Sequence, residues 1–187
     1  MDRGIKIAAV GLVFNLAFSA YHLILGITSG SWWLLTVGVY YLLLSFARFF
    51  VFRVRTSPEV ITKLTGVMLM ILSLPLFGTA VLSVVRDRGI VFHEIVMIAI
   101  ALYAFTKITL AAIKLIKLRG RKSARDRALN TVSFAAALVS IFTLQRSMLV
   151  SFEGMTATEI VIMNLVTGSA VCIAVFWLGL NLFRSKK

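Results

Sequence analysis

The order of apolar and polar residues divides the chain into six long hydrophobic segments separated by short polar stretches. About 20 apolar residues in a helix cross the roughly 30 Å hydrocarbon core of a bilayer, and a helix satisfies its backbone hydrogen bonds internally. We therefore predict an all-α integral membrane protein, built as a single transmembrane domain over residues 1–187. Its six predicted spans are residues 5–26, 32–52, 60–85, 90–115, 128–150 and 159–183.

The first segment has a second interpretation, as a secretory signal peptide. Arg3 and Lys6 precede it, and the run from Ala17 to Ala20 resembles a cleavage site. The apolar run continues to Leu25, however, which is too long for the hydrophobic region of a signal peptide. We favour a membrane span.

Composition and charge agree with a membrane protein and predict its orientation. The chain is 60% hydrophobic and 14% charged, whereas soluble domains carry about 25% charged residues. Its net charge is +13, and when the loops are assigned alternately to two sides, one side receives all 20 Lys and Arg residues except Arg86, Arg88, Arg146 and Lys107. Because basic loops stay in the cytoplasm, we predict cytoplasmic termini and a multi-pass protein of the bacterial inner membrane or plasma membrane.

The basic charge thus reports orientation, and we expect the lipid bilayer as a partner and no nucleic acid. A nucleic-acid interface needs a folded basic face, and no stretch outside the apolar segments is long enough to form one. Cys172 is the only cysteine, so a disulfide framework is excluded, and we interpret it as a small buried hydrophobe. We expect no enzyme, catalytic residue or cofactor, because the spans contain no Ser-His-acid set, paired carboxylates or Gly-rich phosphate loop.

Small and polar residues recur inside four of the predicted spans at helical spacing. They are Gly11, Asn15, Ser19, His22 and Gly26 in the first span, Thr36, Tyr40 and Tyr41 in the second, Asn130, Ser133, Ala137 and Ser140 in the fifth, and Asn164, Gly168 and Cys172 in the sixth. Such residues either let helices pack closely or line a solute pathway. We favour packing and keep the pathway as the alternative.

Lys107 is the one ionisable residue well inside a predicted span. It lies 10 positions, or about 15 Å of helix, from the basic cluster at Lys117, so its long side chain can extend toward the cytoplasmic interface. We favour that interpretation. If Lys107 instead faces the interior, it predicts an anionic solute or a carboxylate partner, and no such carboxylate is evident in the spans.

The run from Asn15 to Ser31, followed by Trp32 to Arg48, resembles the start of the cation diffusion facilitator transporters. In that family an Asn-containing helix leads through a Gly-x-x-Ser-Gly-Ser turn, here Gly26 to Ser31, into the second helix. Six helices, cytoplasmic termini and a basic loop between the fourth and fifth helices also fit the transmembrane domain of the family. The resemblance implies a transporter and a homodimer. The cytoplasmic metal-sensing domain of the family is expected to be absent, because the chain ends four residues after Phe183.

The zinc site of that family has no counterpart here. The ligand positions on the second helix fall on Tyr40 and Leu44, with Val37 at a further acidic position, and those on the fifth helix fall on Asn130 and Phe134 or, one residue earlier, on Leu129 and Ser133. A leucine or valine offers no lone pair, and a phenol is a poor ligand at neutral pH. We therefore expect no metal site, and a neutral hydrogen-bonding set with aromatic faces in its place.

Three hypotheses for function follow. The first is a transporter of an ion or small solute, with Asn15, Tyr40, Tyr41, Asn130, Ser133 and Lys107 as candidate pathway residues. The second is a scaffold or regulatory membrane subunit that kept the fold without transport, and the third is a substrate-binding subunit of a larger importer. A cavity reaching Tyr40 and Asn130 would favour transport, whereas a tightly packed centre between the second and fifth helices would oppose it.

Overall fold

The computed structural model describes residues 3–53, 57–85, 93–117, 123–151 and 155–185, and these residues form helices joined by short connections. The six helices are α1 (Arg3–Ser29), α2 (Trp32–Arg53), α3 (Pro58–Val85), α4 (Glu94–Lys117), α5 (Ala124–Ser151) and α6 (Ala157–Arg184). Each is long and apolar enough to cross a membrane. Within the described residues there is no strand, as the all-α prediction requires.

Several helix ends differ from the predicted spans, because polar capping residues extend the helices beyond their apolar runs. The predicted sixth span starts at Glu159, but α6 starts at Ala157, where Thr156 and Glu159 form a reciprocal capping box. The backbone N–H of Asp126 likewise donates to Ser123 Oγ at the start of α5, four residues before the predicted start. Positions 90–92 of the predicted fourth span lie outside the described residues.

The turn between α1 and α2 explains the spacing of the Gly26 to Ser31 run. Gly30 has φ of 65°, a left-handed conformation that glycine adopts without strain, and it ends α1 after Ser29. The backbone N–H of Ser31 then donates to the Gly26 carbonyl at 3.1 Å, and the Ser31 carbonyl accepts from Leu35 in the first turn of α2. The first of these hydrogen bonds satisfies a carbonyl at the end of α1, and the second is the first helical hydrogen bond of α2.

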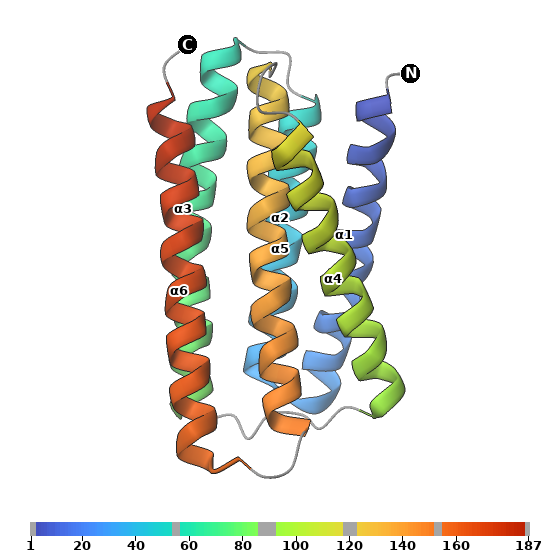
Figure 1. Cartoon of the computed structure of the whole chain (residues 1–187), viewed down its shortest axis with the longest axis vertical. Helices are drawn as coiled ribbons and strands as arrows, with labels where there is room; N and C mark the ends of the chain where they lie inside the picture. Colours follow the sequence, from blue (N-terminus) through green and yellow to red (C-terminus); the bar gives the residue numbers. More distant parts are fainter. Residues whose placement is uncertain (1–2, 54–56, 86–92, 118–122, 152–154, 186–187) are drawn as a thin grey trace.

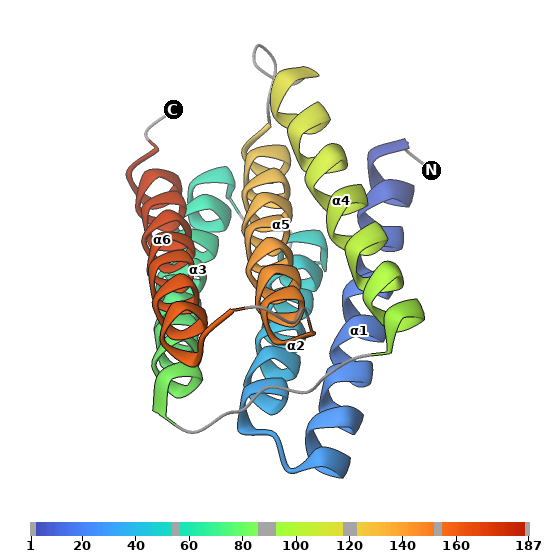
Figure 2. The same cartoon turned by 60° about the horizontal axis from the view of Figure 1, so that its bottom comes forward.

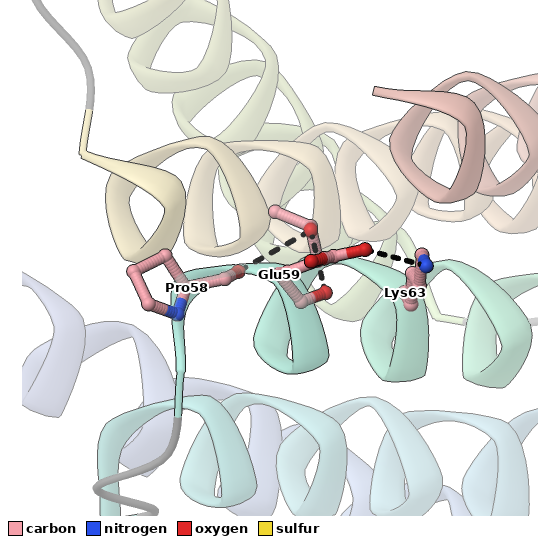
Figure 3. Close-up of polar contacts among 4 residues, drawn as sticks. Pro58, Glu59 and Lys63 are labelled. Carbon is pink, nitrogen blue, oxygen red and sulfur yellow. Dashed lines mark hydrogen bonds and ion pairs between the residues drawn. The ribbon is translucent and has the colours of Figure 1, made fainter. Parts of the chain in front are cut away.

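Helix α3 begins at a proline, which suits the first turn because its missing N–H has no partner there in any case. Figure 3 shows the neighbouring Glu59 and Lys63, whose side chains form an ion pair of 2.6 Å on the exposed surface. Such exposed pairs contribute little to stability. Because both residues lie near the beginning of α3, their charges are nevertheless away from the middle of the helix.

The helices form a bundle in which α3 and α6 lie together along one side, and α4 lies beside α5 and toward α1 (Figures 1 and 2). The beginning of α1 and the end of α6 lie at the same end of the bundle (Figure 1). The most extensive helix contacts are α3 with α6, α1 with α2, and α4 with α5. The main apolar core is formed by α2, α3, α5 and α6.

The outer surface of the bundle is apolar, unlike that of a water-soluble protein, and part of its interior is polar. On α1, Asn15, Ser19 and His22 are each at most 1% exposed, whereas Phe14 and Ile24 are more than half exposed. Large apolar side chains are exposed on all six helices. Such an outer surface is costly in water and favourable in lipid, so the six helices fit a multi-pass membrane protein.

Candidate functional site

The polar stripe of α1 faces the interior of the bundle, and part of it serves helix packing. Ser19 Oγ donates to the Gly38 carbonyl of α2 at 2.7 Å, and His22 Nδ1 donates to the Phe18 carbonyl at 2.9 Å. A Cβ added to Gly38 would lie 2.7 Å from the Leu23 side chain, so α1 and α2 approach closely here. For Ser19 the structure agrees with the packing interpretation.

Lys107 of α4 does not extend to the cytoplasmic interface, so the interpretation that we favoured from sequence is wrong. Its ammonium points into the bundle and donates to Asn15 Oδ1 of α1 at 2.6 Å. The reason is the aromatic surroundings of the ammonium, which lies 4.4 Å from the ring centroid of Tyr103 and 4.6 Å from that of Tyr41. Electron-rich ring faces attract a cation, and the attraction grows where water is excluded.

The aromatic rings around Lys107 come from three helices and are held by one another. Phe18 of α1 stacks on Tyr103 of α4, with centroids 4.3 Å apart and planes inclined by 19°. The edge of Tyr41 from α2 meets Phe18 at 5.0 Å, and the Tyr41 hydroxyl shares a hydrogen bond of 2.8 Å with Ser140 Oγ of α5. We call Asn15, Phe18, Tyr41, Tyr103 and Lys107 the Lys107 cluster.

A second cation lies next to this cluster. Arg48 of α2 is only 7% exposed, and its guanidinium donates to Ser133 Oγ of α5 at 2.9 Å. Arg48 follows Tyr41 by seven residues, so it lies on the same face of α2 as the ring that the ammonium of Lys107 contacts. From sequence we counted Arg48 among the cytoplasmic basic residues; in the structure it lies five residues before the end of α2 and is buried against α5.

Several polar atoms in and next to the Lys107 cluster have no hydrogen-bond partner among the described residues. Asn15 Nδ2, Arg48 Nε and the Tyr103 hydroxyl are buried and have no hydrogen-bond partner in the described part of the chain. The four described carboxylates, Glu59, Glu94, Asp126 and Glu159, all belong to the first turns of helices. No carboxylate among the described residues therefore balances Lys107 and Arg48 inside the bundle.

The structure separates the six candidate pathway residues into three places. Asn15, Tyr41 and Lys107 meet in the cluster, and Ser133 borders it through Arg48. Tyr40 is 1% exposed within the apolar core. Asn130 lies apart, in a cleft between α5 and α6.

The centre between α2 and α5 is packed with side chains. Leu44, Val132, Val139 and Phe142 are each at most 1% exposed there, and Leu44 is one of the two positions on α2 at which the resemblance to the cation diffusion facilitators predicts a ligand. This packing opposes a solute pathway along the predicted line of Tyr40 and Asn130. Across the described helices, no three His, Cys, Asp or Glu side chains lie close enough together to hold a metal ion.

A groove of about 420 Å³ runs between α1 and α4 on the side of the Lys107 cluster. Its walls include Phe14 and Tyr21 of α1 and Ile95 and Ile100 of α4, and it ends against Phe18 and Tyr103. The lining is almost entirely apolar. The stacked pair Phe18 and Tyr103 therefore separates a groove on the outer surface from the buried ammonium.

Three members of this site were not predicted from sequence: Phe18, Tyr103 and Arg48. Tyr103 precedes Lys107 by four residues, so helical spacing alone places it on the same face and could have identified it. Phe18 is apolar, so a search for polar residues inside the spans could not select it. Arg48 was not selected because it lies near the end of an apolar run, where a basic residue is ordinarily at the membrane interface.

Comparison of the chain with protein-family models, curated proteins and solved structures finds no match. The resemblance to the cation diffusion facilitators consequently stays a prediction. The function has to be argued from the Lys107 cluster itself.

Proposed function

We propose that the protein is a multi-pass membrane transporter, with cytoplasmic termini, that binds a small anion beside Lys107. The observation that supports this proposal is the set of unpartnered buried polar atoms around two cations. Asn15 Oδ1 accepts from the ammonium of Lys107, while Asn15 Nδ2 and Arg48 Nε lack an acceptor, and the Tyr103 hydroxyl lacks any partner, among the described residues. An anion supplies both the negative charge and the acceptors.

The energetic reason is the cost of isolated charge in a low-dielectric interior. A buried ammonium or guanidinium is stable only when it is paired and its donors are satisfied, and ionisable groups inside membrane spans mark functional pathways by default. Two neighbouring cations without a carboxylate raise this cost further, because they also repel each other. Bound anion removes both penalties at once.

The position of Lys107 also narrows the class of solute. The aromatic faces of the tyrosines would by themselves suit an organic solute or a weakly hydrated cation. In the structure the ammonium of the protein already lies over Tyr41 and Tyr103, which occupies the cation–π position. A cationic solute would meet repulsion from Lys107 and Arg48, so the geometry favours an anion.

Membrane insertion and orientation are supported by two independent features. The outer faces of the helices expose large apolar side chains, as lipid requires. The assignment of nearly all Lys and Arg residues to the end where α1 begins and α6 ends follows the positive-inside rule, and it makes that end cytoplasmic. Glu94, at the beginning of α4, then lies at the outer end.

Flux into proteoliposomes tests the proposal. Purified protein is reconstituted, and uptake of labelled pyruvate, succinate and phosphate is compared with uptake of methylammonium and zinc. We expect uptake of at least one anion, and Lys107→Met should lower it at least about tenfold, because a hydrogen bond to a charged group contributes roughly 1.5–3 kcal/mol. Lys63→Met is the matched control and should leave the flux unchanged, since Lys63 is exposed near the beginning of α3.

Uptake of zinc or methylammonium without uptake of any anion would contradict the proposal. Equal anion uptake by the Lys107→Met variant and the unaltered chain would contradict the role of Lys107.

A second function, that of a scaffold or regulatory membrane subunit, is favoured by the packed centre between α2 and α5. In that case Lys107 and Asn15 form only a structural link between α4 and α1. The scaffold hypothesis predicts no flux of any solute and no stabilisation of the protein by anions, and these results would separate it from transport.

A further inference from the structure

The Lys107 cluster is not the only place where buried donors lack acceptors among the described residues. A cleft of about 370 Å³ lies between α5 and α6, toward the end of the bundle where α5 begins and α6 ends. One wall is formed by α5, with Arg127, Asn130, Thr131 and Phe134, and the other by the end of α6 and its C-cap, with Leu178, Asn181, Leu182 and Ser185. On each helix these residues recur at intervals of three and four, so they form one continuous face.

The cleft is polar at its mouth and apolar farther inside. Arg127 donates through Nη1 to Ser185 Oγ at 2.8 Å, which joins the two helices at the mouth. Phe134 lies seven residues farther along α5, or about 10 Å deeper, and faces Leu178 within the same cleft. An occupant that matches both ends has a polar head and an apolar chain.

The polar end has donors that no described residue satisfies. Arg127 Nε and Asn130 Nδ2 are buried atoms without a hydrogen-bond partner in the described helices. The nearest described carboxylate in sequence, Asp126, is exposed and accepts from Ser123. A guanidinium and an amide that both lack acceptors are suited to phosphate oxygens.

We propose that this cleft binds one anionic phospholipid of the cytoplasmic leaflet, with its phosphate at Arg127 and Asn130 and an acyl chain against Phe134 and Leu178. The lipid supplies the missing acceptors, and its chain covers the apolar wall. Basic pockets between membrane helices on the cytoplasmic side favour anionic head groups for the same reason. This inference goes beyond transport, and it rests on the proposed insertion of the helices with this end of the bundle in the cytoplasm.

Native mass spectrometry of the delipidated full chain, titrated with equal amounts of phosphatidylglycerol and phosphatidylcholine, tests the site. We expect the chain to retain phosphatidylglycerol in preference by about fivefold, because each basic residue near a lipid surface contributes about 1 kcal/mol. Arg127→Gln should remove most of the preference. Asn130→Asp, which keeps the size of the side chain and adds a repelling charge, should do the same.

Arg53→Gln is the matched control, because Arg53 is exposed at the end of α2 and carries the same charge at the same end of the bundle. The preference should survive this substitution. Equal retention of the two lipids by the unaltered chain, or equal losses for Arg53→Gln and Arg127→Gln, would overturn the proposal. So would displacement of the lipid by millimolar inorganic phosphate, since the ligand would then be a free anion.

Discussion

Two helix pairs in this bundle are built in opposite ways. Helices α3 and α6 meet through glycines: a Cβ at Gly66 would lie 2.7 Å from the Gly179 carbonyl, and a Cβ at Gly179 would lie 2.8 Å from the Gly66 carbonyl. Helices α1 and α4 are joined instead by long side chains, through the bond from Lys107 to Asn15, beside a groove of about 420 Å³. The contact of α3 with α6 is thus between backbones, whereas the contact of α1 with α4 depends on a buried charge.

The difference shows where the bundle can respond to a ligand. Small residues fix the distance between α3 and α6 by van der Waals contact, which no solute changes. The link between α1 and α4 contains a cation whose energy depends on the charges around it. If an anion binds beside Lys107 as we propose, we expect its effect at the contact of α1 and α4 and not at the contact of α3 and α6.

The largest effect is expected from enlarging a glycine in the α3 and α6 contact. Gly179→Leu should lower the free energy of unfolding by about 3 kcal/mol or prevent folding, because its Cβ would meet backbone atoms of Gly66 and Met70, which cannot give way. Thermal unfolding in detergent measures the change.

Gly78 of α3, the helix that α6 packs against, is the control, since a Cβ added there has no atom within 4 Å. Gly78→Ala should leave the stability unchanged or raise it by up to about 1 kcal/mol, because alanine favours helix. A Gly179→Leu variant as stable as the unaltered chain would show that α3 and α6 are not held by this close approach.

A smaller effect is expected in the α1 and α4 contact, where removal of Asn15 alone should cost more than removal of Asn15 and Lys107 together. Asn15→Leu should lower the free energy of unfolding by about 2 kcal/mol, because the buried ammonium loses its acceptor. Lys107→Met should be neutral or stabilising, since an apolar side chain of similar length replaces a buried charge. Chemical or thermal unfolding of both variants measures the difference.

The double variant Asn15→Leu with Lys107→Met gives the sharper result. It should recover most of the stability that Asn15→Leu loses. Additive losses in the double variant would show that the two residues act independently, and the contact between them would then have no energetic role.

The fold was largely predictable because lipid imposes a simple rule on sequence. Apolar runs of about 20 residues identified all six helices, and errors were confined to their ends. At the end of α1, Thr28 and Ser29 donate to carbonyls of the preceding turn and continue the helix beyond Gly26. Capping by Thr156 had the corresponding effect at the beginning of α6.

The candidate site was less predictable. The hydropathy of a segment does not show how the helix is rotated about its axis or which other helices pack against it. Asn15, Tyr41 and Lys107 were selected as polar residues in spans, but nothing in the sequence indicated that α1, α2 and α4 would bring them together. The alternative direction of Lys107, toward the interface, has the same helical position and differs only in the rotamer of a flexible chain. The rings of Tyr103 and Phe18 decide between the two, and they come from different helices.

The most direct test of the central claim is equilibrium stabilisation by anions. Purified protein in phosphatidylcholine nanodiscs is unfolded thermally in the presence of pyruvate, succinate or phosphate at matched ionic strength. A ligand that binds only the folded state at 100 times its Kd raises stability by about 2.7 kcal/mol. We predict a rise in Tm with at least one anion, and none for Lys107→Met. Equal rises for both proteins, or no rise with any anion, would contradict the account.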